Sequence, residues 1–152
     1  MRANQSHNGV MLLKLSLGLL IFWAAWISVV FLTNLFAGLK LVHLLPGGWK
    51  VASNNYTLIQ KTTERYATPA WMNGFLFAGV IAWQAAQVAL FWRAVFSPTS
   101  SAVDLSFGVS LALWAAFILA DEIFLAYPRE GSHLEIFIAQ LVSLLLIHQA
   151  IA

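Results

Sequence analysis

The chain has 152 residues, of which 61% are hydrophobic and only 9% are charged, and its mean hydropathy is +0.79. Because soluble domains carry about 25% charged residues, this composition cannot cover a water-facing surface, and an ordinary soluble protein is excluded. The net charge of +2 arises from few charges of either sign and does not indicate a nucleic-acid partner, while the lack of cysteine excludes disulfides, thiolate metal sites and cysteine nucleophiles.

Four apolar runs are long enough to cross a bilayer, which requires about 20 residues per helix. They cover residues 10–39, 70–96, 103–127 and 134–152. The first run begins like a signal peptide, but the apolar part of a signal peptide has only about 7 to 15 residues, so we interpret this run as a retained helix. The sequence therefore predicts an all-α integral membrane protein: one domain over residues 1–152, folded as a four-transmembrane-helix bundle in lipid.

The connection over residues 40–69 has a pattern of its own. Tyr56, Ile59, Thr63 and Tyr66 recur at helical spacing, which predicts a short interfacial helix against the bundle. The basic residues on this side of the predicted bundle are Lys40, Lys50, Lys61, Arg65 and Arg129, and those on the other side are Arg2, Lys14 and Arg93. The positive-inside rule then favours a cytoplasmic connection in a cell (inner) membrane, with both termini together on the opposite side.

Three short motifs are typical of helix starts: Thr68–Pro69, Ser101 with Asp104, and Ser132 with Glu135. In the last two, a serine followed three positions later by an acid forms a capping box, in which each side chain satisfies a free amide at the helix start. This interpretation gives Asp104 and Glu135 structural roles in place of catalytic ones.

The second span combines a stripe of small residues with a separate polar face. Small residues let membrane helices approach closely, and here they are Gly74, Ala78, Ala82, Ala85 and Ala89. The polar face consists of Asn73, Gln84 and Gln87, and the fourth span adds Gln140. We expect these amides to form a secondary polar face of the bundle.

The third span has a small-residue stripe that runs through Gly108, Ala112 and Ala115 to Glu122. If this stripe packs inward, Glu122 faces the interior of the bundle. Asp121 lies about 100° further round the helix and is then expected to face a neighbouring chain, headgroups or water.

The two acids lie inside an apolar run at the end of the third span, where the helix dipole disfavours negative charge. Because the connection that follows is short, the fourth helix returns antiparallel and brings further ionisable residues to a similar depth. We therefore predict a polar cluster at one end of the third and fourth helices, made of Asp121, Glu122, Arg129, His133 and Glu135.

Several kinds of site are compatible with these residues. A metal ion would take Glu122, His133 and Glu135 as ligands. Glu130 and His133 have the spacing of a dimetal ligand pair, but a turn at Gly131 is expected to separate them.

A haem would use His43 and His148 as axial ligands, and the many tryptophan and phenylalanine side chains could line a quinone site. The sequence does not decide between these cofactors.

The leading functional interpretation is a small multi-pass protein that acts as an accessory or scaffolding subunit of a larger membrane complex, and not as an enzyme. Its partners would be the lipid bilayer and other membrane subunits or further copies of the chain, with no nucleic acid. The alternative is a cofactor-binding redox module for haem, metal or quinone, or a small membrane enzyme that uses the carboxylate and histidine cluster.

Overall fold

The computed structural model describes residues 2–151 and, within them, the side chains of residues 11–150. Its elements are α1 (Arg2–Leu41), α2 (Asn55–Thr63), the short 3-10 helix η1 (Glu64–Tyr66), α3 (Ala70–Phe96), α4 (Ser100–Ile123) and α5 (Tyr127–Ile151). Four of them, α1, α3, α4 and α5, are long and apolar enough to cross a membrane. The predicted all-α membrane bundle is confirmed, and a short helix lies in the first connection.

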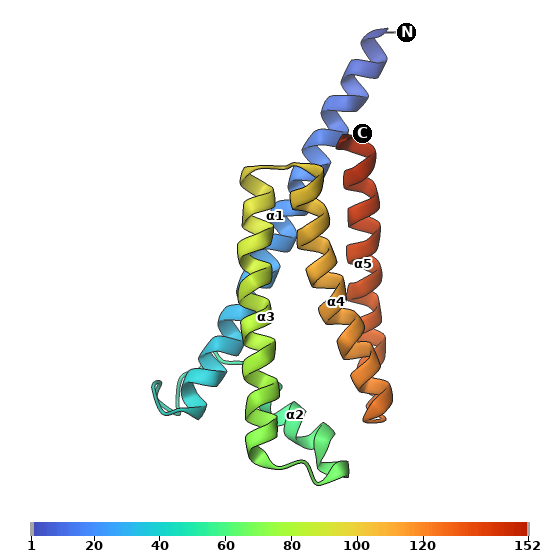
Figure 1. Ribbon diagram of the computed structural model, residues 1–152. Helices are drawn as coiled ribbons and strands as arrows, with labels where there is room; N and C mark the ends of the chain where they lie inside the picture. The colour runs from blue at the N-terminus through green and yellow to red at the C-terminus, as the bar shows by residue number, and fades with distance from the viewer. Residues whose placement is uncertain (1, 152) are drawn as a thin grey trace.

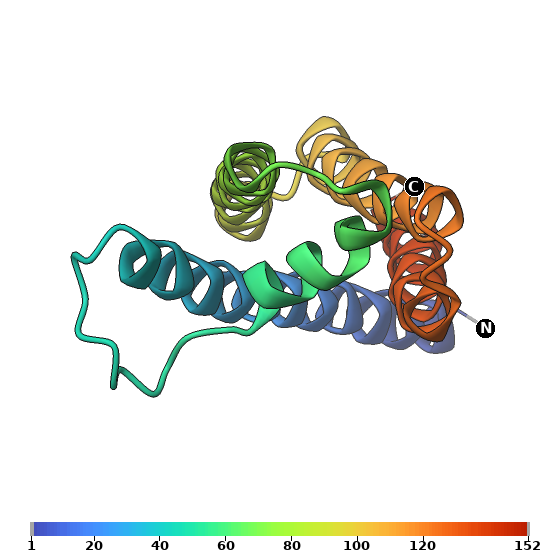
Figure 2. The same ribbon diagram turned by 90° about the horizontal axis from the view of Figure 1, so that it is seen from below.

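The four long helices run up and down beside one another (Figure 1). α1 crosses the bundle obliquely and packs against α3 and α5, while α4 and α5 form an antiparallel hairpin. The N-terminal end of α1 extends past the other helices, at the same end of the bundle as the end of α5 and the α3–α4 connection. At the opposite end, α2 lies across the bundle and contacts α1 and α3 (Figure 2).

Aromatic and aliphatic side chains from all four long helices form the core. Phe91 of α3 and Phe107 of α4 meet edge to face there, with ring centroids 5.1 Å apart. Near the other end of α1, a Cβ atom at Gly38 would lie only 3.0 Å from Ile81 Cδ1. The glycine thus allows α1 and α3 to approach closely. The core cluster consists of Leu20, Trp23, Ala24, Ile27, Phe91, Ala94, Ala102, Val103, Phe107 and Ile147.

Helix α3 keeps the predicted bounds, but its cap differs by one residue. Pro69 occupies the N-cap position, where its missing N–H is not needed. The Thr68 hydroxyl does not cap α3; it donates a hydrogen bond to the carbonyl oxygen of Thr63 at 3.0 Å.

The start of α4 corrects one predicted capping box. Thr99 is the N-cap residue, and its Oγ1 accepts a hydrogen bond from the backbone N–H of Ala102 at 3.3 Å. Ser101 therefore already lies inside the helix, and Asp104 lies beyond the first turn. The capping roles predicted for Ser101 and Asp104 are wrong, because a threonine directly after the proline break is the first side chain able to cap.

The turn between α4 and α5 comes earlier in the chain than predicted. Leu125 adopts a left-handed conformation with φ 53°. Its N–H donates to the Glu122 carbonyl oxygen at 3.2 Å, and the Ala126 N–H donates to the Asp121 carbonyl oxygen at 2.7 Å. These two bonds form a Schellman motif, which satisfies the last carbonyl groups of a helix and ends it.

Helix α5 consequently begins before Gly131, and the turn predicted at Gly131 does not form. Pro128 falls in the first turn of α5, where a proline is favoured because no intrahelical N–H bond is required. Ser132 and Glu135 lie within the helix, so the second predicted capping box is wrong as well.

The inward faces of α3 and α4 carry mainly polar and large side chains, and most residues of the two predicted small-residue stripes are exposed. On α3 the buried residues include Asn73, Gln84 and Gln87, and on α4 they include Ser110, Trp114 and Asp121. The exposed residues include Ala78, Ala82, Ala85, Ala89, Gly108 and Ala112. The inward packing expected for the stripe of the third span is therefore wrong. Lipid solvates alkyl side chains well and amides poorly, so the polar side chains are buried inside the bundle.

Candidate functional site

The centre of the predicted polar cluster is a contact between α4 and α5. The Asp121 side chain is buried, with a residue exposure of 4%, and its Oδ2 lies 2.5 Å from His133 Nδ1. The His133 ring also packs against Trp114 and Phe117, at centroid distances of 5.7 and 5.2 Å. An ionisable pair is thus held beside two aromatic rings at the inner face of the hairpin.

The other members of the predicted cluster do not join this pair. Glu122 and Glu135 are exposed, Arg129 is partly exposed, and Arg129 forms no ion pair among the described side chains. The expectation that Glu122 faces inward and Asp121 outward is wrong. The line through Ser110, Trp114 and Asp121 defines the inner face of α4, and Glu122 lies outside it.

A second Asp–His pair lies at the other end of the same hairpin. Asp104 Oδ1 is 2.6 Å from His148 Nε2; the Asp104 side chain is exposed and the His148 side chain is partly exposed. The sequence patterns assign these two residues to separate roles, one as a helix cap and the other as a haem ligand. Along α4 the two aspartates are about 25 Å apart, close to the roughly 30 Å thickness of the hydrocarbon core.

Polar side chains continue between the two pairs. We call the set formed by Asp104, Ser106, Ser110, Trp114 and Asp121 of α4 together with His133, Gln140, Ser143 and His148 of α5 the polar seam. Ser143 Oγ accepts a hydrogen bond from Trp23 Nε1 at 3.0 Å, which ties the seam to α1. By contrast, Ser110 Oγ, Trp114 Nε1 and both amide atoms of Gln140 are buried without a hydrogen-bond partner among the described residues.

One residue of the secondary polar face, Gln84, helps to hold the first connection against the bundle through Asn34. Asn34 of α1 donates from Nδ2 to Gln84 Oε1 at 2.9 Å. Its Oδ1 accepts from Ser53 Oγ at 2.5 Å and from Asn55 Nδ2 at 2.8 Å. Asn34 is only 1% exposed, so this node joins α1, α3 and the start of α2 inside the bundle.

Asn73 has a comparable role at the start of α3. Its Oδ1 accepts a hydrogen bond from Thr63 Oγ1 at 2.8 Å, which fastens the end of α2 to α3. The Tyr66 hydroxyl then donates to the Ile123 carbonyl oxygen at 2.7 Å and reaches the end of α4. The segment α2–η1 therefore links both halves of the bundle.

The predicted metal and haem ligands lie apart from one another. Within the described residues no group of three or more His, Asp or Glu side chains could hold a metal ion. Glu122 and Glu135 do not contact His133, whose carboxylate partner is Asp121. His43 follows the end of α1, at the end of the bundle opposite His148, so these two histidines cannot ligate one haem (Figure 1).

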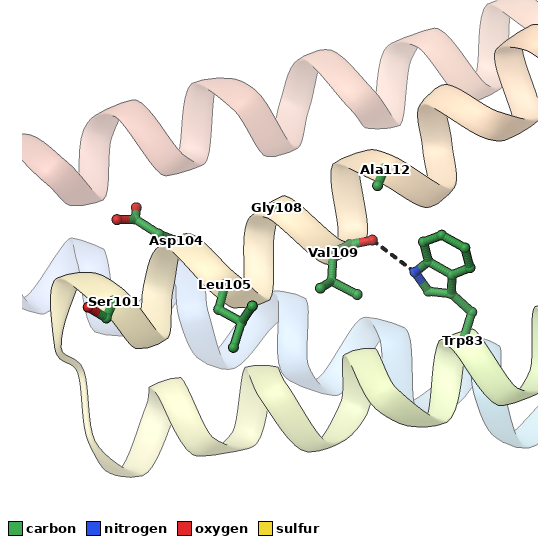
Figure 3. A pocket seen from close by; sticks show the side chains of 7 residues that line it. All are labelled: Trp83, Ser101, Asp104, Leu105, Gly108, Val109 and Ala112. Atoms are coloured by element: carbon green, nitrogen blue, oxygen red, sulfur yellow. Dashed lines mark hydrogen bonds between the residues drawn. The ribbon is translucent and has the colours of Figure 1, made fainter.

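A shallow groove of about 550 Å³ lies on the outer face of α3 and α4 (Figure 3). Trp83 closes one end, where its Nε1 donates to the Val109 carbonyl oxygen at 3.0 Å. Asp104 lies towards the other end, with its carboxylate directed to α5. The floor of the groove includes the small residues Gly108 and Ala112.

Comparison of the chain with protein-family models, with curated proteins and with solved structures finds no match. The function is therefore inferred from the faces, grooves and polar contacts of the bundle itself.

Proposed function

We propose that the protein acts by association, as an accessory or scaffolding subunit of a larger membrane complex. The observation that supports this function is the outward direction of the small residues of α3 and α4. The stripe consists of Ala78, Ala82, Ala85 and Ala89 on α3, with Gly108 and Ala112 on α4.

Helix association in lipid depends on close backbone approach, which small residues permit. In this bundle the stripe residues are exposed, whereas the buried faces of α3 and α4 consist mainly of aromatic, aliphatic and polar side chains. A Cβ atom added at Gly79 or Gly108 would meet nothing within 4 Å. The stripe and the adjoining groove are accordingly suited to a transmembrane helix of another subunit.

Bulky substitutions on the stripe test this proposal. We expect Ala82→Ile and Gly108→Ile to release the protein from its assembly, because the added side chains hold the partner backbone away. Both positions are exposed, so the stability of the isolated chain is expected to change by less than about 0.5 kcal/mol. The measurement is size-exclusion chromatography after extraction of native membranes in mild detergent.

Ala139→Ile is the matched control, since Ala139 is an exposed small residue on α5, away from the stripe. It is expected to leave the assembly intact. A wild-type protein that migrates as a single 16.8 kDa chain, or stripe variants that stay assembled, would contradict the proposal.

A cofactor-binding redox module is the second possibility, and the buried Asp121–His133 pair beside Trp114 is the observation that favours it. Iron, haem or quinone present in stoichiometric amount in the purified protein, and lost in His133→Ala, would support this function. A colourless, metal-free protein that co-migrates with larger subunits would support association.

We also propose that the chain lies in a cell membrane with both termini on one side and the first connection on the other. The sequence lacks cysteine, so single-cysteine variants can be labelled without background. Ser97→Cys and Gln149→Cys are expected to react with an impermeant maleimide from the same side, and Gly48→Cys from the opposite side. Labelling of Ser97→Cys and Gln149→Cys from different sides would refute this topology.

A further inference from the structure

Four buried polar side chains near the middle of the bundle have no hydrogen-bond partner among the described residues. They are Gln87 of α3, Ser110 and Trp114 of α4, and Gln140 of α5. Gln87, Ser110 and Gln140 are 0% exposed and Trp114 is 6% exposed. Inside a membrane an unpaired polar group is strongly unfavourable, so groups of this kind indicate a function that needs them.

The four side chains share one depth in the membrane. The two Asp–His pairs fix the antiparallel register of α4 and α5, which puts Gln140 level with the stretch from Ser110 to Trp114. The contact of Phe91 with Phe107 brings Gln87, one turn from Phe91, to the level of Ser110. Three helices therefore place buried donors and acceptors at the level of the middle of the polar seam.

The two ends of the polar seam have matching chemistry. Each end holds one aspartate of α4 and one histidine of α5, and the described Lys and Arg side chains form no ion pair with either aspartate. Histidine is the side chain that most readily gains and releases protons near neutral pH. A proton acceptor is thus present at both membrane faces, with hydroxyl, indole and amide groups between them.

We propose that the polar seam carries protons across the membrane along a chain of ordered water. Water molecules supply the partners that Gln87, Ser110, Trp114 and Gln140 require, since a buried water bonds to two to four polar groups. A proton taken up at one Asp–His pair passes along the water hydrogen bonds and leaves from the other pair. No covalent bond other than O–H and N–H changes, and the transmembrane proton gradient drives the transfer.

This path rests on the interior of the bundle, whereas the proposed association rests on its outer face. The proposed proton path and the proposed association can therefore be refuted independently of each other.

The test is proton flux through the full-length protein in liposomes that contain a pH-sensitive dye, with potassium and valinomycin setting the membrane potential. Wild-type protein is expected to admit protons well above the rate of protein-free liposomes. Gln140→Leu is expected to lower the flux by at least about tenfold, because an apolar side chain interrupts the single file of water. Gln149→Leu, the same change at an exposed position of α5, is expected to keep the wild-type flux.

The folded state of Gln140→Leu can be checked by thermal unfolding, and its stability is expected to stay close to that of the wild type, because leucine has a similar volume and Gln140 makes no hydrogen bond to another described residue. Ser110→Ala is a second, smaller change in the same seam and is expected to lower the flux in the same direction. Wild-type flux equal to that of empty liposomes, unchanged flux in Gln140→Leu, or passage of sodium ions as fast as protons would each overturn the proposal.

Discussion

Replacing Asn34 with leucine is expected to lower the free energy of unfolding by about 2 to 4 kcal/mol, because one buried and two partly buried hydrogen bonds are lost together. The substitution keeps the approximate size of the side chain but removes the donor to Gln84 and the acceptor of Ser53 and Asn55. The measurement is denaturation of the detergent-solubilised protein followed by tryptophan fluorescence. Limited proteolysis is expected to cut the connection between α1 and α2 faster than in the wild type.

Asn54→Leu is the matched control for this experiment. Asn54 immediately precedes α2, is exposed, and makes no side-chain capping hydrogen bond. Its replacement is expected to change stability by less than about 0.5 kcal/mol, as is usual for surface positions. Equal losses of unfolding free energy in Asn34→Leu and Asn54→Leu would show that the hydrogen bonds of Asn34 do not hold the first connection against the bundle.

Asp121→Ala is expected to destabilise the protein by about 1 to 3 kcal/mol, because His133 then loses its partner at a largely buried position. Glu122→Ala, one residue further along, is expected to cost less than about 0.5 kcal/mol, since Glu122 is exposed and unpaired with His133. Thermal unfolding of the two variants side by side makes this comparison.

A double-mutant cycle gives a sharper form of the same test. If Asp121 and His133 act as a pair, the double variant Asp121→Ala/His133→Ala should lose less free energy of unfolding than the sum of the losses in the two single variants. Additive losses, or a Glu122→Ala variant as unstable as Asp121→Ala, would mean that the short contact between α4 and α5 contributes nothing to the fold.

The spans of the bundle could be predicted from the sequence because hydropathy over about 20 residues is a strong signal. The predicted span over residues 70–96 has the bounds observed for α3. The predicted α4–α5 turn is misplaced because its left-handed position holds Leu125, whereas such positions usually hold glycine. The glycine on which the prediction rests, Gly131, lies inside α5.

The inner faces were harder to assign, because two general rules for membrane helices disagree in this chain. Small residues are expected at helix contacts, and polar residues are expected to point inward. For α4 the second rule holds: Asp121 follows Ser110 and Trp114 inward, and Glu122 follows Gly108 and Ala112 outward.

The Asp104–His148 contact could have been predicted from the sequence. In a helical hairpin, residues at equal distances from the turn face each other, and the register that joins Asp121 to His133 also joins Asp104 to His148. No such pattern in the sequence predicts the contacts of Asn34. Ser53 and Gln84 reach Asn34 from an irregular connection and from a helix that α1 crosses obliquely, so their spacing in the chain does not specify the contact.

The Asn34 node also bears on how the chain is made. Asn34 leaves the ribosome before Ser53, Asn55 and Gln84, so α1 enters the bilayer while this amide is still without partners. The bonds from Ser53 and Asn55 require only that the first connection folds back onto α1, whereas the bond to Gln84 requires α3 as well. The buried amide of Asn34 therefore gains its full set of partners only when the second span is in place.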